Sequence, residues 1–211
     1  MSNCPVTSRR WAAIAMLAMV LGCRTDPLDA PYVNASTAAA AALAQYDTDK
    51  NNDLDAEELK QAPGIRAAIT LGDTDKDGGL SKNELISRIK TMVGDEVGMM
   101  SLAARILYNG QPLEGAEVKF IPEPCLGPTF QPGSGKTNAQ GIAAIKMNNE
   151  KFPGMQCGWF KVEVSKKDTS GKELVSEQYN AKTTLGAEVA LDVPSLERGL
   201  IFELKSQSDG K

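Results

Sequence analysis

The chain has 211 residues, 42% of them hydrophobic and 24% charged, which is enough for one domain or two small ones. It contains no histidine, which excludes Ser-His-Asp and Cys-His catalysis and any metal or haem site that needs an imidazole. The net charge of −4 and the 5% aromatic content argue against nucleic acid as a partner. No nucleophile–base pair is visible, so we do not expect an enzyme. The chemistry that remains is the binding of a hard cation by oxygen ligands.

Residues 1–22 have the pattern of an export signal. Arg9 and Arg10 precede an apolar run that ends at Gly22 and is shorter than the about 20 residues needed to span a bilayer. The end of the run, Val-Leu-Gly followed by Cys23, resembles the cleavage box of bacterial lipoproteins, whose cysteine carries the lipid. The resemblance implies an exported cell-envelope protein anchored to a membrane through Cys23, with residues 23–35 as a tether. The alternative is a soluble secreted protein cut near the same place.

Two acidic segments repeat in the helical pattern that follows, which covers residues 36–95. Residues 47–58 read DTDKNNDLDAEE and residues 73–84 read DTDKDGGLSKNE, so both begin with the same four residues and end in glutamate. The second segment matches the calcium-loop pattern at every constrained position, and the first matches it at all but one. Both segments resemble the loops of EF-hands. The alternatives are a dockerin-like module and a solvated acidic turn without metal, and the glutamate at position twelve of each loop favours EF-hands.

The resemblance implies two Ca²⁺ sites with oxygen ligands, because Ca²⁺ takes six to eight oxygens from such a loop and Mg²⁺ fits a bidentate glutamate less well. In the first loop the implied ligands are Asp47, Asp49, Asn51, the carbonyl of Asp53, Asp55 through a water molecule, and Glu58. In the second loop they are Asp73, Asp75, Asp77, the carbonyl of Gly79, Ser81 through a water molecule, and Glu84.

The pair of loops has two further features that bear on its geometry. Asn52 occupies the sixth position, where the family has glycine, so the first site is predicted to be the weaker one. Pro63 and Gly64 interrupt the short segment between the loops, which predicts that the first leaving helix ends near residue 62 and that the next helix is short. Leu54 and Leu80, at the eighth positions, are expected to form a short β-bridge.

The second half of the chain, residues 99–205, alternates apolar and polar residues between turn signals, and residues 206–211 form a tail. The alternating segments are Glu117–Phe120, Phe160–Val164, Val189–Val193 and Ile201–Leu204. This pattern predicts an antiparallel β-sandwich of about seven strands, so the fold class is α+β with two domains. Residues 106–123, 136–145 and 158–164 resemble carboxypeptidase regulatory-like domains, which implies a transthyretin-like sandwich and says little about function.

Two cysteines remain after the export signal is removed and Cys23 is lipidated. Cys125 and Cys157 would lie in an oxidising compartment, which predicts a disulfide between them. The sequence as a whole predicts calcium binding by two EF-hand loops, with a mainly structural ion. The alternative is an envelope or adhesion module whose sandwich binds a carbohydrate or a protein, with calcium ordering the domain junction.

Overall fold

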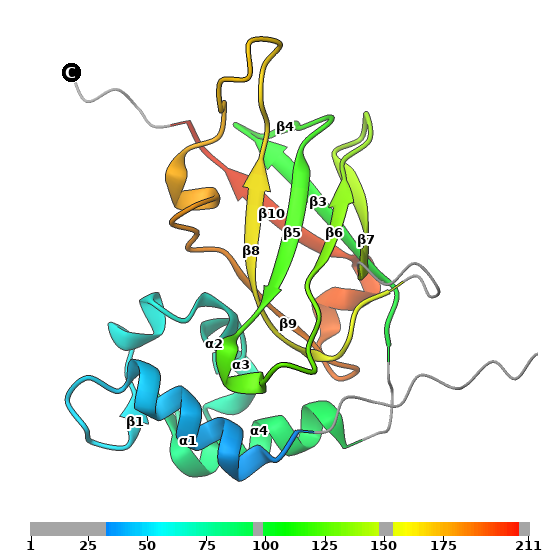
Figure 1. The fold of residues 1–211 in the computed structure, drawn as a ribbon. Coiled ribbons are helices and arrows are strands. Elements are labelled where there is room, and N and C mark those ends of the chain that lie inside the picture. The colour runs from blue at the N-terminus through cyan, green and yellow to red at the C-terminus, as the bar shows by residue number, and fades with distance from the viewer. Residues whose placement is uncertain (1–32, 95–98, 148–153, 207–211) are drawn as a thin grey trace, which may run out of the picture.

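The structure, a computed structural model, describes residues 33–94, 99–147 and 154–206. A group of helices lies at one end of a curled β-sheet (Figure 1). Within the described ranges, no helix has the length and apolar character needed to cross a membrane. The predicted export signal, Cys23 and most of the predicted tether lie outside the described residues.

The helical part begins with α1 (Ala35–Tyr46), whose first turn is capped by the side chain of Asn34. Asn34 Oδ1 accepts a hydrogen bond of 3.0 Å from the backbone N–H of Thr37, which satisfies one of the free donors at the helix start. The elements that follow are β1 (Asp53–Leu54), the 3-10 turn η1 (Glu58–Lys60), α2 (Pro63–Ala67), α3 (Ile69–Gly72), β2 (Leu80–Ser81) and α4 (Lys82–Val93).

The predictions for the segment between the two loops and for the β-bridge are confirmed. The first acidic loop is followed by the single turn η1. Pro63 is the first residue of α2, a position where the backbone N–H would have no partner within the helix, so its absence does not destabilise the helix. The helix that enters the second loop, α3, is four residues long. β1 and β2 pair antiparallel with Leu54 opposite Leu80, and both leucine side chains are buried.

The second part is a sheet that contains eight strands within the described residues. They are β3 (Leu102–Tyr108), β4 (Gln111–Pro112), β5 (Glu117–Pro122), β6 (Gly133–Lys136), β7 (Ile142–Met147), β8 (Gly158–Ser165), β9 (Gly186–Val189) and β10 (Leu200–Leu204). Three 3-10 turns connect them: η2 (Pro124–Leu126), η3 (Glu177–Tyr179) and η4 (Pro194–Arg198). The strand order is β10-β3-β7-β6-β5-β8-β9, with β4 paired to β3. Every pair is antiparallel except β10 with β3, which is parallel.

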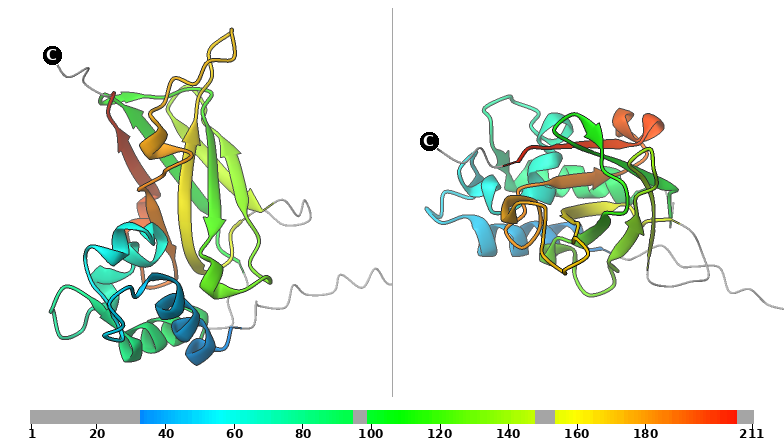
Figure 2. Two further views of the ribbon diagram at one scale, coloured as in Figure 1. Left: turned by 60° about the vertical axis from the view of Figure 1, so that its left-hand side comes forward. Right: turned by 90° about the horizontal axis from the view of Figure 1, so that it is seen from above.

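The α+β fold class is confirmed, and so are the inward faces of two predicted strands. Val118 and Phe120 on β5 are fully buried, as are Phe160, Val162 and Val164 on β8. The sandwich was expected to have about seven strands, whereas hydrogen bonds join all eight into one continuous sheet. This sheet curls over so that β10 and β3 lie across from β5 and β8 (Figure 2).

The predicted strand Val189–Val193 is wrong. β9 ends at Val189, and the chain turns at once, with the Val193 N–H donating to the Ala190 carbonyl at 3.2 Å. Pro194 then opens η4, because its fixed φ and missing N–H suit the start of a helical turn better than the middle of a sheet. The alternation of apolar residues in this segment therefore comes from a turn with Leu191 exposed.

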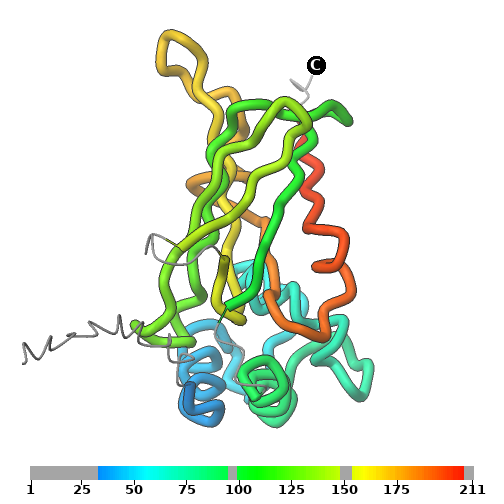
Figure 3. Tube along the Cα trace, turned by 90° about the vertical axis from the view of Figure 1, so that its right-hand side faces the viewer, coloured from blue at the N-terminus to red at the C-terminus, as the bar shows by residue number. Residues whose placement is uncertain are grey.

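The helical part packs directly on one end of the sheet (Figure 3). The described residues form two apolar cores. One of them combines side chains of α1, α2 and α4 with residues from the sheet half, namely Cys125, Leu126, Phe130, Cys157, Trp159 and Ala190. The other core lies inside the curled sheet. α2 lies so close to β9 that a Cβ on Gly186 would overlap the carbonyl of Pro63, which explains glycine at that position. The two halves of the chain therefore share one packed interface.

Candidate metal centre

The backbones of the two acidic loops follow the same path. Asp47 at the first position accepts hydrogen bonds from the N–H groups of Lys50 at 2.6 Å and Asn52 at 2.9 Å. In the second loop Asp73 accepts the equivalent bonds from Lys76 at 2.6 Å and from Gly78 at 3.0 Å. These bonds require sharp turns, and the four donor residues all have positive φ. Asn52 has a φ of 68°, which a non-glycine residue adopts at a cost in free energy.

The glutamate at the twelfth position closes each loop onto its second residue. Glu58 Oε1 accepts from the Thr48 N–H at 2.6 Å and the Thr48 hydroxyl at 2.8 Å. Glu84 Oε1 accepts from the Thr74 N–H at 2.7 Å and the Thr74 hydroxyl at 2.8 Å. Glu84 also forms a capping box with Ser81 at the start of α4. The Thr-to-Glu contacts thus bring the two ends of each loop together.

Both glutamates are buried, and hydrogen bonds keep them ionised. Burial acts to raise the pKa of Glu84, but the bonds from Thr74 and Ser81 outweigh it and lower that pKa to about 2. Burial likewise opposes ionisation of Glu58, whose pKa is nevertheless lowered by the bonds from Thr48 and Asp55. Each loop therefore offers a charged carboxylate on its inner side at neutral pH.

Three carboxylates of each loop come together in a way that could hold a metal ion. Oxygen atoms of Asp47, Asp49 and Glu58 lie within 4.8 Å of one another, and the same is true of Asp73, Asp75 and Glu84. The other predicted ligands lie in the same loops but bond to neighbouring groups. Asn51 Oδ1 accepts from the Asp53 N–H, Asp77 Oδ1 accepts from the Gly79 N–H, Asp55 Oδ1 accepts from the Glu58 N–H, and the Ser81 hydroxyl donates to Glu84.

The residues present fit a hard dication. Their side chains offer only oxygen, and the carboxylates of each loop repel one another unless a cation lies between them. Asp53 Oδ1 is also buried and has no hydrogen-bond partner in the described part of the chain, so a nearby cation would stabilise its charge. Position seven of the second loop, Gly79, has no Cβ, and a Cβ there would overlap the Asp53 carboxylate.

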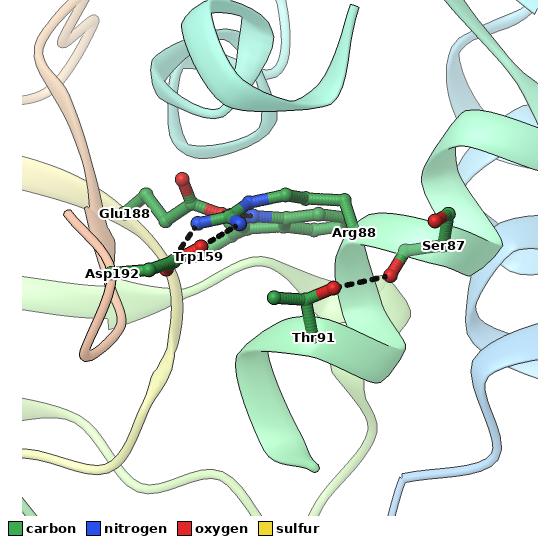
Figure 4. A network of polar contacts seen from close by, with 6 residues as sticks. All are labelled: Ser87, Arg88, Thr91, Trp159, Glu188 and Asp192. Atoms are coloured by element: carbon green, nitrogen blue, oxygen red, sulfur yellow. Dashed lines mark hydrogen bonds and ion pairs between the residues drawn. The ribbon is translucent and has the colours of Figure 1, made fainter. Parts of the chain in front are cut away.

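A network of polar contacts that the sequence did not reveal joins α4 to the sheet (Figure 4). The guanidinium of Arg88 donates from Nε to Glu188 Oε1 at 2.7 Å and from its two terminal nitrogens to Asp192 at 2.6 and 2.9 Å. The indole N–H of Trp159 donates to the same Glu188 oxygen at 2.9 Å. Arg88 and Glu188 are only 5% and 3% exposed. This network lies in the interface between the helical part and the sheet.

A second buried acid, Glu123, connects α1 and α2 to the sheet. Its carboxylate is 0% exposed and accepts from the Tyr46 hydroxyl at 2.9 Å and the Gly64 N–H at 2.8 Å. Lys161 Nζ lies 3.8 Å from the same carboxylate. Burial raises the pKa of Glu123, although the Lys161 charge and the two hydrogen bonds oppose that rise. No local sequence signal pairs residues so far apart along the chain.

The predicted disulfide is wrong, because Cys125 and Cys157 are not joined in the structure. Both are buried in the apolar core between the helical part and the sheet. The loop that they flank is closed by a hydrogen bond of 2.8 Å from the Glu123 N–H to the Trp159 carbonyl, so it is held without a covalent link. Burial and the charge of Glu123 raise the pKa of the Cys125 thiol to about 12, which keeps it protonated.

Comparison with known proteins finds a similarity in the helical part. The EF hand family model matches residues 39–62 and 65–90, two segments that contain the two acidic loops. No curated protein and no solved structure gives a significant match to the chain. The matched segments are thus similar to EF hands, and each contains residues of one carboxylate cluster that could hold a metal ion. The resemblances to carboxypeptidase regulatory-like domains and to lipoproteins stay predictions.

Proposed function

We propose that the protein binds two Ca²⁺ ions, one in each acidic loop, and that these ions stabilise the packing of the helical part on the sheet. The observation that carries the proposal is the pair of carboxylate clusters, each with oxygens within 4.8 Å, in segments that match the EF hand model. A bound Ca²⁺ ion supplies the positive charge that neutralises these carboxylates. The residues that hold it are the six predicted in each loop.

The connection from each loop to the interface supports a structural role. Tyr46, which donates to buried Glu123, directly precedes Asp47 of the first loop. Arg88, which bonds to Glu188, follows Glu84 of the second loop by about one turn of α4. Because α1 ends and α4 begins at ligand residues, fixing the ligands also fixes the helix ends that carry these interface residues.

The covered apolar face of the helical part also favours a structural ion over a sensor. In calcium sensors of this kind the ion opens a groove between helices for a partner. Here the buried side chains of α1 and α4 share a core with Trp159, Leu126 and Phe130 of the sheet half. A groove that opened on calcium binding would have to expose this core. The ions are therefore better suited to stabilising the packed core than to opening a groove.

The test is a calorimetric titration of the full chain, stripped of metal by a chelator, with Ca²⁺ and with Mg²⁺ as the control. We expect two binding events for Ca²⁺, of which Asp47→Ala removes the weaker and Glu84→Ala the stronger. The same protein should unfold at a higher temperature with Ca²⁺ than with chelator. The absence of heat at millimolar Ca²⁺ would refute calcium binding, and binding without a change in melting temperature would refute the structural role.

We also propose that the protein is exported and anchored to a cell-envelope membrane through Cys23, a proposal that depends on the sequence pattern of residues 1–23. Expression in a bacterial host fed with an alkyne-tagged fatty acid should label the protein. Cys23→Ala should abolish the label and release the protein from the membrane fraction. Membrane association of the unlabelled variant would contradict the anchor. A carbohydrate or protein partner of the sheet, and the absence of enzymatic activity, stay predictions.

A further inference from the structure

Asp53 faces the opposite loop. It holds position seven of the first loop, where only the backbone carbonyl is a predicted ligand, and β1 and β2 pair it with Ser81. Its carboxylate lies against the backbone of Gly79, the residue at position seven of the second loop. A Cβ built on Gly79 would overlap Asp53 Oδ2 and lie 3.0 Å from Oδ1. The absence of a side chain at Gly79 therefore makes room for the carboxylate of Asp53.

This carboxylate lacks a compensating positive group in the described part of the chain. Oδ1 is buried and accepts no hydrogen bond, and none of the ion pairs among the described residues includes Asp53. The backbone N–H of Leu54 interacts with this carboxylate, but the carboxylates of Asp77 and Glu84, both in the second loop, lie close enough to repel it. A half-buried carboxylate that has no ion-pair partner and faces other carboxylates is costly unless a cation lies nearby.

We infer that Asp53 serves both loops, through its backbone carbonyl in the first and through the charge of its carboxylate in the second. The inference depends on the proposed calcium binding and gives the side chain of Asp53 a role that the EF-hand pattern does not assign. The second loop has four acidic side chains of its own, Asp73, Asp75, Asp77 and Glu84. Asp53 adds a fifth negative charge to that site and repels the other four when no ion is present. It acts as a positioning and coupling residue and is not assigned a coordination bond.

The first experiment is a comparison of Asp53→Asn with Glu57→Gln in the full chain that already carries Asp47→Ala, so that the remaining heat comes from the second loop. Glu57 is the matched control, because its loss removes the same charge from the same loop, but its side chain is 78% exposed and it is not a predicted ligand. We expect Asp53→Asn to weaken Ca²⁺ binding by about tenfold, the size expected for one charge near a dication in a water-accessible site. The control variant Glu57→Gln should change the Ca²⁺ affinity less than twofold.

The melting temperature of the metal-free protein gives a second readout, which does not depend on calcium. Removing the unpaired charge should raise this temperature for Asp53→Asn, while Glu57→Gln should leave it unchanged or lower it slightly. Equal Ca²⁺ affinities for the two variants, together with equal metal-free melting temperatures, would overturn the inference and leave calcium binding intact. A parent protein that binds no Ca²⁺ in either loop would instead overturn the proposed function and this inference with it.

A double-mutant cycle tests the contact itself. Gly79 does not have a positive φ, so the main obstacle to alanine there is the Asp53 carboxylate. We expect Gly79→Ala to lower the metal-free melting temperature in the parent chain and to have a much smaller effect in Asp53→Ala. Equal losses in both backgrounds would show that the Asp53 carboxylate does not lie against Gly79, and would overturn the inference.

Discussion

Replacement of Arg88 by methionine tests whether the interface between helices and sheet is a main source of stability. Methionine keeps most of the apolar stem of arginine but removes all three hydrogen bonds to the sheet. Glu188, which is 3% exposed, would then hold a buried negative charge that still accepts a hydrogen bond from the indole N–H of Trp159. The carboxylate of Asp192 would lose both of its bonds to the guanidinium.

The two acids contribute unequally to the expected loss. Removing one partner of a buried ion pair typically costs about 3–5 kcal/mol, because the other charge stays buried without compensation. That figure applies to the Arg88–Glu188 contact. The side chain of Asp192 is 44% exposed, so water replaces its partner and its share is about 1 kcal/mol or less. We therefore expect Arg88→Met to lower the free energy of unfolding by about 3–5 kcal/mol and the melting temperature by about 6–20 °C.

Urea unfolding followed by circular dichroism measures this loss, with Arg105→Met as the control. Arg105 is an exposed arginine on β3, and its replacement should change stability by about 0.5 kcal/mol or less. The double variant Arg88→Met/Glu188→Gln should recover part of the loss, because glutamine removes the stranded charge and can still accept the Trp159 N–H. A loss below about 1 kcal/mol for Arg88→Met, or no recovery in the double variant, would refute the reasoning.

Two further predictions concern single residues. Asn52→Gly should raise the Ca²⁺ affinity of the first loop in calorimetry, because glycine adopts the φ of 68° without the strain that asparagine carries, which is about 1 kcal/mol at most. An unchanged affinity would show that Asn52 does not weaken this loop. The folded-state pKa of Glu123 is raised, so the folded protein binds a proton more readily than the unfolded chain and gains stability as the pH falls toward the ordinary value for glutamate. In urea unfolding at successively lower pH, the Glu123→Gln variant should lack this gain in stability, whereas the variant of the exposed Glu203, Glu203→Gln, should keep it.

The sequence predicted the helical part well because each constraint in it is local. The acidic loops need particular residues at fixed positions, so the second loop could be recognised from Asp73, Asp75, Asp77, Gly78 and Glu84. Pro63 likewise marks the start of a new helix wherever it occurs. The inward faces of β5 and β8 were predictable for a similar reason, since alternation along a strand fixes which side chains are buried.

The arrangement of the sheet was less predictable, because it depends on contacts between distant residues. Nothing near Leu200–Leu204 indicates that β10 runs parallel to β3, or that all strands join in one sheet. The end of β9 at Val189 was not predicted either. Apolar and polar residues continue to alternate after Val189, although Pro194 and the Arg88–Asp192 contact favour a turn there. The disulfide prediction failed because it assumed that two cysteines must pair, whereas the core between helices and sheet buries both thiols.

The contacts of the interface can be compared with calcium by their contributions to the free energy of unfolding. For the proposed exported protein we expect dissociation constants of about 10⁻⁴–10⁻³ M, as in extracellular calcium modules, so 1 mM Ca²⁺ would stabilise the fold by about 0.4–1.4 kcal/mol per site. That is less than the about 3–5 kcal/mol assigned to Arg88 and its buried partner. The apolar core and the Arg88 and Glu123 contacts should therefore keep the two halves together without metal. Calcium, bound at residues next to Tyr46 and one turn before Arg88, would then adjust the stability of an interface that already exists.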